Sequence, residues 1–128
     1  MAKYGNKKTI MDGFCFDSKA EARRYQQLKL LEKVGDIFDL ELQPKYTLVP
    51  KYTTRCGKVR RAITYTADFR YKVLLSRVKH AYKKDTEVSF TVVEDVKSPA
   101  TAKNTTYIMK RNLFQYQNPN VDFREVLM

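Results

Sequence analysis

The feature that most constrains the fold is the segment 61–75, RAITYTADFRYKVLL, in which apolar and polar side chains alternate almost without interruption. Such alternation places successive side chains on opposite faces of a β-strand. We therefore predict a long, half-buried strand over 61–75. A second segment, 88–96 (VSFTVVEDV), is apolar enough for a strand buried on both faces. The chain must then fold around a sheet whose faces are covered by other elements.

Two helices are predicted around this sheet. Ser18 and Glu21 form the pattern S-x-x-E of a capping box, the following residues repeat at helical spacing, and Gly35 provides a C-cap. A second helix is predicted over 104–116. Further strands are expected at 13–17, 37–42, 46–49 and 121–127, with a turn at Cys56-Gly57 and a polar excursion over 76–87.

The predicted order of elements specifies a fold class. A crossover through the second helix would place the last strand parallel to its neighbour. We therefore expect an α/β protein with a mixed β-sheet flanked by helices. At 128 residues the chain has room for a single domain, 1–128, in which residues 1–12 would form a flexible basic arm.

Composition excludes several classes of protein. Two cysteines and one histidine cannot supply a disulfide framework or a four-ligand zinc site, and they make a Ser-His-Asp triad improbable. No apolar run approaches the 18 residues of a membrane span, and no apolar segment follows the basic N-terminus as in a secretory signal. We expect a cytoplasmic protein that has no membrane partner.

Positive charge is concentrated in one part of the chain. The net charge is +11, and residues 41–80 hold 10 basic against 2 acidic residues. A basic block of this kind favours a polyanionic partner, with nucleic acid as the first candidate. The alternative is a basic surface that serves only solubility.

Four residues make up a candidate reactive site. Asp68 is one of only two acids in the basic block, and it lies on the polar side of the 61–75 pattern. Asp95 and Lys97 share one face of the 88–96 strand, whereas Glu94 projects to the other face. Glu21 lies on the first helix. Each also has a simpler interpretation: an ion pair for Asp68, a pair at a strand end for Asp95 and Lys97, and a capping residue for Glu21.

Together, the order of these residues resembles a known family. The segments GFCFDSKAEARRY, LQPKYTL, YTADFRY and VVEDVKS are similar to those of the PD-(D/E)xK nuclease superfamily, in particular small phage and prophage nucleases that include Holliday-junction resolvase-like enzymes. The resemblance runs from Tyr4 to Leu127. One departure is that the superfamily's proline before the first aspartate is Ala67 here. The implied fold is a restriction-endonuclease-like mixed sheet.

The resemblance also implies a metal-dependent mechanism. Hydrolysis of a phosphodiester needs an activated water and a stabilised leaving oxygen, and Mg²⁺ can serve both needs with only one or two carboxylate ligands. Asp68 and Asp95 are the candidate direct ligands, and the resemblance adds the Val96 carbonyl. Glu21 would bind the ion through water or hold a second ion, and Lys97 would orient the attacking water or stabilise charge. Mn²⁺ is the expected substitute for Mg²⁺.

Basic side chains along the chain would contact DNA phosphates. The candidates are Lys3, Lys7, Lys8, Lys45, Lys51, Arg55, Lys58, Arg60, Arg61, Lys103, Lys110 and Arg111. For each one, generic surface charge is the alternative. Gln43 is interpreted as a turn residue rather than a support of the site. Tyr107, Phe114 and Tyr116 are interpreted as core residues of the second helix rather than as platforms for bases.

The functional hypothesis is a metal-dependent DNA endonuclease that prefers branched DNA, of the Holliday-junction resolvase type. Two symmetric cuts need two active sites, so the family implies a homodimer. If the chain is encoded by a phage, its compartment would be the cytoplasm of the bacterial host. The alternatives are a non-specific phage nuclease and a non-enzymatic basic nucleic-acid-binding protein. A third possibility, an RNA-processing factor, differs only in substrate.

Overall fold

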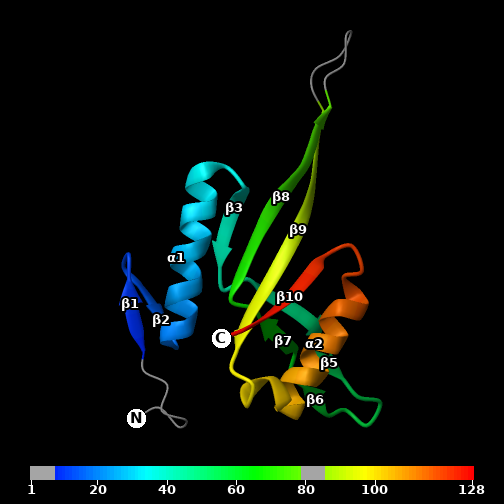
Figure 1. Ribbon diagram of the computed structural model, residues 1–128. Helices are drawn as coiled ribbons and strands as arrows, with labels where there is room; N and C mark the ends of the chain where they lie inside the picture. The colour runs from blue at the N-terminus through cyan, green and yellow to red at the C-terminus, as the bar shows by residue number, and fades with distance from the viewer. Residues whose placement is uncertain (1–7, 79–85) are drawn as a thin grey trace.

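A computed structural model describes residues 8–78 and 86–128 of the chain (Figure 1). Its helices are α1 (Lys19–Val34) and α2 (Thr105–Gln117), with a short 3₁₀ turn, η1 (Thr101–Lys103). Its strands are β1 (Thr9–Met11), β2 (Phe14–Phe16), β3 (Ile37–Leu42), β4 (Lys45–Val49), β5 (Tyr52–Thr53), β6 (Val59–Arg60), β7 (Ile63–Thr66), β8 (Phe69–Val78), β9 (Thr86–Lys97) and β10 (Asp122–Leu127).

The central sheet has the strand order β10-β9-β8-β3 within the described residues. β8 pairs antiparallel with both β9 and β3, while β10 runs parallel to β9 after the crossover through α2. The predicted parallel last strand is therefore confirmed. So is the mixed α/β class, since α1 and α2 lie on either side of the sheet in Figure 1.

Local sequence signals position both helices. The Ser18 hydroxyl accepts a hydrogen bond from the Glu21 amide, and Gly35 adopts a left-handed conformation with φ of 88° at the C-cap. At α2 the Asn104 side chain accepts from the Tyr107 amide. The predicted boundaries of α1 are confirmed, and those of α2 agree within one residue.

Each face of the sheet has its own apolar core. On one face α1 packs through Tyr25 and Leu28 against Phe69 of β8 and Val92 of β9. The core of the other face consists of Leu48 of β4, Tyr65 of β7, Ala67 between β7 and β8, Val93 of β9 and Phe114 of α2. Phe114 is fully buried, as predicted, and Tyr107 packs at the margin of this second core. Tyr116 is 86% exposed, so its assignment to the core was wrong.

The alternating segment 61–75 is two strands rather than one. β7 pairs with β4, and β8 pairs with β3 and β9, so the chain changes sheets at Ala67 and Asp68. The Ala67 amide donates to the Pro44 carbonyl, and the next amide, that of Asp68, donates to the Glu94 carbonyl. Tyr65 therefore faces the second core and Phe69 faces the first, although both share one parity in the sequence. Periodicity alone does not detect such a change of hydrogen-bonding partner.

Other differences concern the ends of elements. Residues 9–11 of the expected basic arm form β1, which pairs with β2 through a turn in which Asp12 and Gly13 have φ of 51° and 81°. The dipeptide Asp-Gly is a strong hairpin signal that would have revealed this turn. Residues 1–7 of the arm lie outside the described residues. The polar excursion over 76–87 is shorter than predicted, because β8 continues to Val78 and β9 starts at Thr86. The remaining part, 79–85, also lies outside the described residues.

Candidate active site

The predicted site residues converge where the N-terminal turn of α1, the β7–β8 junction and the end of β9 meet. Glu21 comes from α1, Asp68 from the junction, and Asp95 and Lys97 from β9. Asp95 and Lys97 both influence the pKa of Glu21 through space, and Asp95 and Glu21 both influence that of Asp68. Residues 21, 68 and 95, which are widely separated in the sequence, therefore share one electrostatic environment.

Asp68 is held against β9 by its backbone and its side chain. Its amide donates to the Glu94 carbonyl at 3.1 Å, and its Oδ2 accepts from the Val96 amide at 2.6 Å. Burial, the Asp95 carboxylate and a hydrogen bond with it raise the pKa of Asp68 to about 9. Near neutral pH Asp68 therefore retains its proton.

Asp95 is almost completely buried, with 1% of its surface exposed. Its Oδ2 accepts a hydrogen bond from the Tyr65 hydroxyl, and burial followed by the Asp95 charge keeps the pKa of that tyrosine far above its usual value. Its Oδ1 lies 3.0 Å from Lys97 Nζ but has no partner with hydrogen-bond geometry. The ammonium gives charge compensation, and one buried oxygen still lacks an aligned donor.

Glu21 has two roles. Its backbone amide donates to the Ser18 hydroxyl at the N-cap of α1, a contact that any residue at this position could make. Its side chain, however, lies in the shared acidic environment. Burial and then Asp17 raise the pKa of Glu21 to about 7, with a smaller contribution from Asp95, while Lys97 opposes the rise. Titratable groups perturbed together by burial and specific charges are typical of functional sites, although structural ion pairs also perturb pKa values.

Asp95 and Lys97 open into a polar cleft of about 380 Å³. It is lined by β7, the end of β9, and the first turns of α2, including Thr64, Thr66 and Lys110. A larger cavity of about 810 Å³ lies between α1 and the β1–β2 hairpin. That cavity is lined by none of the four predicted site residues, whereas Asp95 and Lys97 line the smaller cleft.

A buried ion pair that the sequence reasoning missed joins α1 to β9. Arg24 donates from Nε and Nη2 to the two carboxylate oxygens of Glu94, both at 2.7 Å, and the Tyr71 hydroxyl donates to the same carboxylate. Glu94 is completely buried. The strand alternation did predict that Glu94 points away from Asp95, and the contacts confirm it. Its arginine partner was not predictable, because 70 residues separate the two in sequence.

Lys97 is oriented by α2. Its Nζ lies 4.7 Å from the centroid of the Tyr107 ring, a cation–π distance. The Tyr107 hydroxyl and Arg111 Nη1 both donate to Glu125 on β10. Arg111, one of the predicted DNA contacts, therefore forms an ion pair within the fold.

The other predicted DNA contacts lie in several places. Lys110 lines the cleft, and Lys103 is exposed on η1. Lys8 is exposed just before β1, whereas Lys3 and Lys7 lie outside the described residues. The remaining candidates are exposed along the β4–β7 hairpin: Lys45, Lys51, Arg55, Lys58, Arg60 and Arg61. Gln43 is an exposed turn residue with φ of 51°, as interpreted, and its amide donates to the Asp68 carbonyl.

The donor set fits a hard divalent cation only in part. Among residues 8–78 and 86–128, no group of three or more His, Cys, Asp or Glu side chains is arranged to hold a metal ion. Direct ligation would therefore rest on Asp68, which keeps its proton in the absence of a metal, and on Asp95, whose buried Oδ1 lacks an aligned donor. Two carboxylates with backbone oxygen and water suffice for Mg²⁺, which retains much of its hydration.

Fold and site together define a mixed α/β protein with an acidic pair and a lysine in a basic setting. Over residues 1–127 the chain matches the family described as "Protein of unknown function (DUF1064)", and it belongs to that family. No curated protein and no solved structure matches the chain. In the part of the chain described, neither helix has the length and apolar character needed to cross a membrane.

Proposed function

We propose that this protein is a metal-dependent endodeoxyribonuclease that hydrolyses phosphodiester bonds, with a preference for branched DNA of the Holliday-junction type. The observation that carries the proposal is that Glu21, Asp68, Asp95 and Lys97 share one electrostatic environment, in which Asp95 and Lys97 line a polar cleft. These residues come from three separate segments and stand in the chain order that the PD-(D/E)xK superfamily uses. The mixed sheet with helices on both sides is compatible with a restriction-endonuclease-like fold.

The protein residues would divide the work of hydrolysis. Asp68, Asp95 and the Val96 carbonyl would hold the cation, and Glu21 would contact it through water. Mg²⁺ or Mn²⁺, when bound, would lower the pKa of a water and neutralise charge on the departing oxygen. Lys97, kept beside Asp95 by Tyr107, would orient the attacking water and balance negative charge on the phosphate. Lys110, in the same cleft, would contact the phosphate backbone.

The first test is cleavage of a substrate panel by the wild type and Asp95→Asn. Asn preserves the shape of the side chain and still accepts the Tyr65 hydrogen bond, but it removes the buried charge. We expect metal-dependent paired nicks in a four-way junction from the wild type. For the variant we expect a loss of at least about 100-fold, the lower range for removal of one catalytic group, with DNA binding retained. The panel includes linear duplex, single-stranded DNA and RNA, each with Mg²⁺, Mn²⁺ or EDTA.

Asp39→Asn is the matched control, because Asp39 pairs with Lys72 on the exposed surface. It should cleave like the wild type. Equal cutting of every DNA substrate would leave a non-specific nuclease and remove the preference for branched DNA. Absence of cleavage in every metal, with DNA binding intact, would overturn the proposal of an enzyme and favour a non-enzymatic DNA-binding protein.

A further inference from the structure

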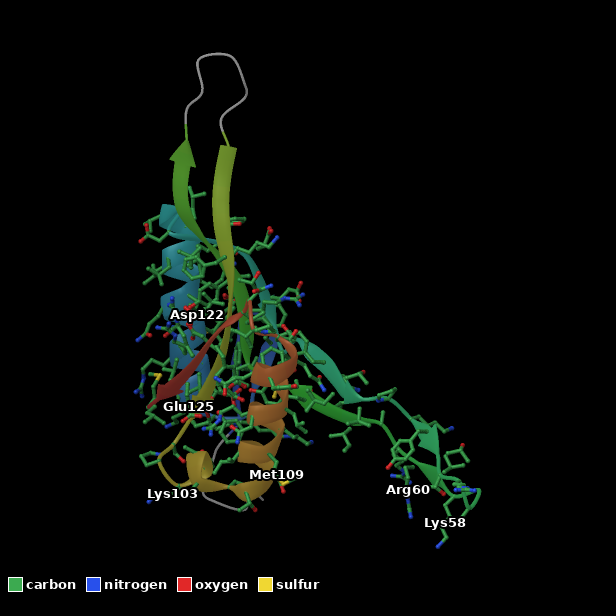
Figure 2. All side chains as sticks on the ribbon, turned by 90° about the vertical axis from the view of Figure 1, so that its right-hand side faces the viewer. Lys58, Arg60, Lys103, Met109, Asp122 and Glu125 are labelled. Atoms are coloured by element: carbon green, nitrogen blue, oxygen red, sulfur yellow. The ribbon has the colours of Figure 1, made fainter. Side chains whose placement is uncertain are left out.

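Within the part of the chain that the structure describes, a projecting hairpin carries exposed basic side chains. We call it the hairpin arm and define it as residues 50–62, which extend the β4–β7 pair through β5 and β6. Figure 2 shows the arm projecting from the body of the molecule, with Lys58 and Arg60 at its far end. Apart from Thr54, every residue from 51 to 62 is exposed. The arm therefore contributes almost nothing to the apolar cores.

The arm has a defined conformation despite its exposure. Tyr52 pairs with Arg60 and Thr53 with Val59. At the tip the Thr54 amide donates to the Lys58 carbonyl at 2.7 Å, and Thr54 Oγ1 accepts from the Lys58 amide at 3.0 Å. Gly57 permits the turn with φ of 88°. A hairpin that buries so little is only marginally stable by itself, which suggests that a partner completes its contacts.

The charge of the arm selects the kind of partner. Between Leu42 and Ala67 the chain has no acidic residue, and it has the six basic residues Lys45, Lys51, Arg55, Lys58, Arg60 and Arg61. Exposed apolar side chains accompany them, with Tyr52 at 50% and Val59 at 57% exposure. Cationic side chains contact phosphates, while apolar and aromatic side chains can contact sugars and bases. A two-stranded ribbon also fits the major groove, which is about 12 Å wide.

The arm begins at the catalytic cleft. Thr64, Tyr65 and Thr66 of β7 line that cleft together with Asp95 and Lys97. From Thr66 to Arg60 the chain advances six residues, or at most about 20 Å at about 3.3 Å per residue. That length corresponds to about six base pairs at about 3.4 Å each. DNA bound along the arm would therefore extend directly to the cleft that Asp95 and Lys97 line.

From this arrangement we infer that the hairpin arm is a duplex-binding ribbon that binds DNA in a groove up to about six base pairs from the phosphate that is cut. The inference rests on the proposed function for its substrate class and for the position of the cut. It assigns DNA binding to a part of the chain distinct from the cleft. Binding and cleavage should thus be separable by mutation.

The test measures binding of a 30-base-pair duplex in EDTA, where no cleavage occurs, as a function of salt. The arm variant is Lys58→Ala/Arg60→Ala/Arg61→Ala. The matched control is Lys19→Ala/Arg23→Ala/Lys33→Ala, which removes three exposed cations from α1. If all three arm residues contact phosphates, the slope of log K against log salt should become shallower by about 2.7 in the arm variant. The slope of the control should stay at the wild-type value.

Hydroxyl-radical footprinting on a junction gives a second measurement. The wild type should protect about six base pairs on one side of the cut, in line with the span estimated above, and the arm variant should lose this protection. The inference is overturned if the arm variant keeps the wild-type salt slope and footprint. It is also overturned if the control variant loses as much of the slope and footprint as the arm variant does. Tighter binding to phosphatidylserine vesicles than to the duplex would also overturn it.

The two proposals fail in different ways. If DNA binding depends on the arm but no metal supports cleavage, the nuclease proposal is overturned and the inference about the arm is supported. If cleavage depends on a metal but DNA binding does not depend on the arm, the inference about the arm is overturned and the nuclease proposal is supported.

Discussion

Asp68 and Asp95 bring two largely buried carboxyl groups close together. Asp95 is buried beside one ammonium, and Asp68 keeps a proton instead of ionising at its ordinary pKa. Such arrangements cost stability and are retained where function needs them. At the scale of single residues, the site is therefore expected to lower stability at neutral and alkaline pH.

The Asp68→Asn variant tests this expectation. An unfolded aspartic acid loses its proton near pH 3.8, whereas folded Asp68 keeps it until about pH 9. The folded state thus binds more protons across this window. The contribution of Asp68 to stability is full below pH 3.8 and is lost as the pH rises through about 9. Asn has no charge to lose and can still accept the Val96 hydrogen bond. At pH 8 the free energy of unfolding of the variant should exceed that of the wild type by more than about 1 kcal/mol, since one pKa unit corresponds to roughly that energy.

Urea denaturation at pH 5 and pH 8 measures the effect. The difference between Asp68→Asn and the wild type should grow from the lower pH to the higher one, and Mg²⁺ should reduce it by stabilising the wild type. Asp39→Asn, on the exposed surface, provides the control and should show no such trend. An unchanged difference between the two pH values would refute the prediction.

At the scale of elements, the Arg24–Glu94 pair fixes α1 against β9. Glu21 and Arg24 lie one helical turn apart, so they project to neighbouring positions on the same side of α1. Glu94 directly precedes Asp95. The pair therefore links the helix that carries Glu21 to the strand that carries Asp95 and Lys97. It serves as a positioning contact for the site, because it touches none of the proposed reacting groups.

Replacement of Arg24 should lower the free energy of unfolding more than replacement of Glu94. Arg24→Met leaves a completely buried carboxylate with Tyr71 as its one remaining donor among the described residues, and breaking a buried pair in this way costs about 3–5 kcal/mol. Glu94→Gln leaves a guanidinium that is 20% exposed and can reach water, so its cost should be smaller. Urea denaturation gives both values. The neighbouring exposed Arg23→Met should stay within about 0.5 kcal/mol of the wild type. Equal effects of Arg24→Met and Arg23→Met would show that the pair has no structural role.

At the scale of the whole molecule, each chain presents one candidate site. Symmetric incision of two strands at a junction requires two sites related by a twofold axis. We therefore expect sedimentation equilibrium to give twice the chain mass of 15.1 kDa for the protein bound to a junction, after subtraction of the DNA. A single chain per junction together with paired nicks would contradict this prediction.

The local elements of this protein follow from its sequence. Ser18 and Gly35 specify the limits of α1, and the apolar run of β9 specifies a buried strand, because caps and periodicity depend on residues close together in the chain. The chain order of Glu21, Asp68, Asp95 and Lys97, through its resemblance to a nuclease superfamily, predicted residues that the structure brings into one electrostatic environment. Positive charge in the middle of the chain indicates a polyanionic partner, which stays a prediction.

Only the tertiary structure decided how these parts meet. The alternating segment 61–75 divides at Asp68 because two consecutive amides donate to carbonyls of Pro44 and Glu94, on different strands. That division directs the Asp68 side chain to β9 and also generates the projecting hairpin. The Arg24–Glu94 and Tyr65–Asp95 contacts are likewise made across 70 and 30 residues. Patterns of neighbouring residues carry no information about such partners, since the choice depends on how distant segments pack.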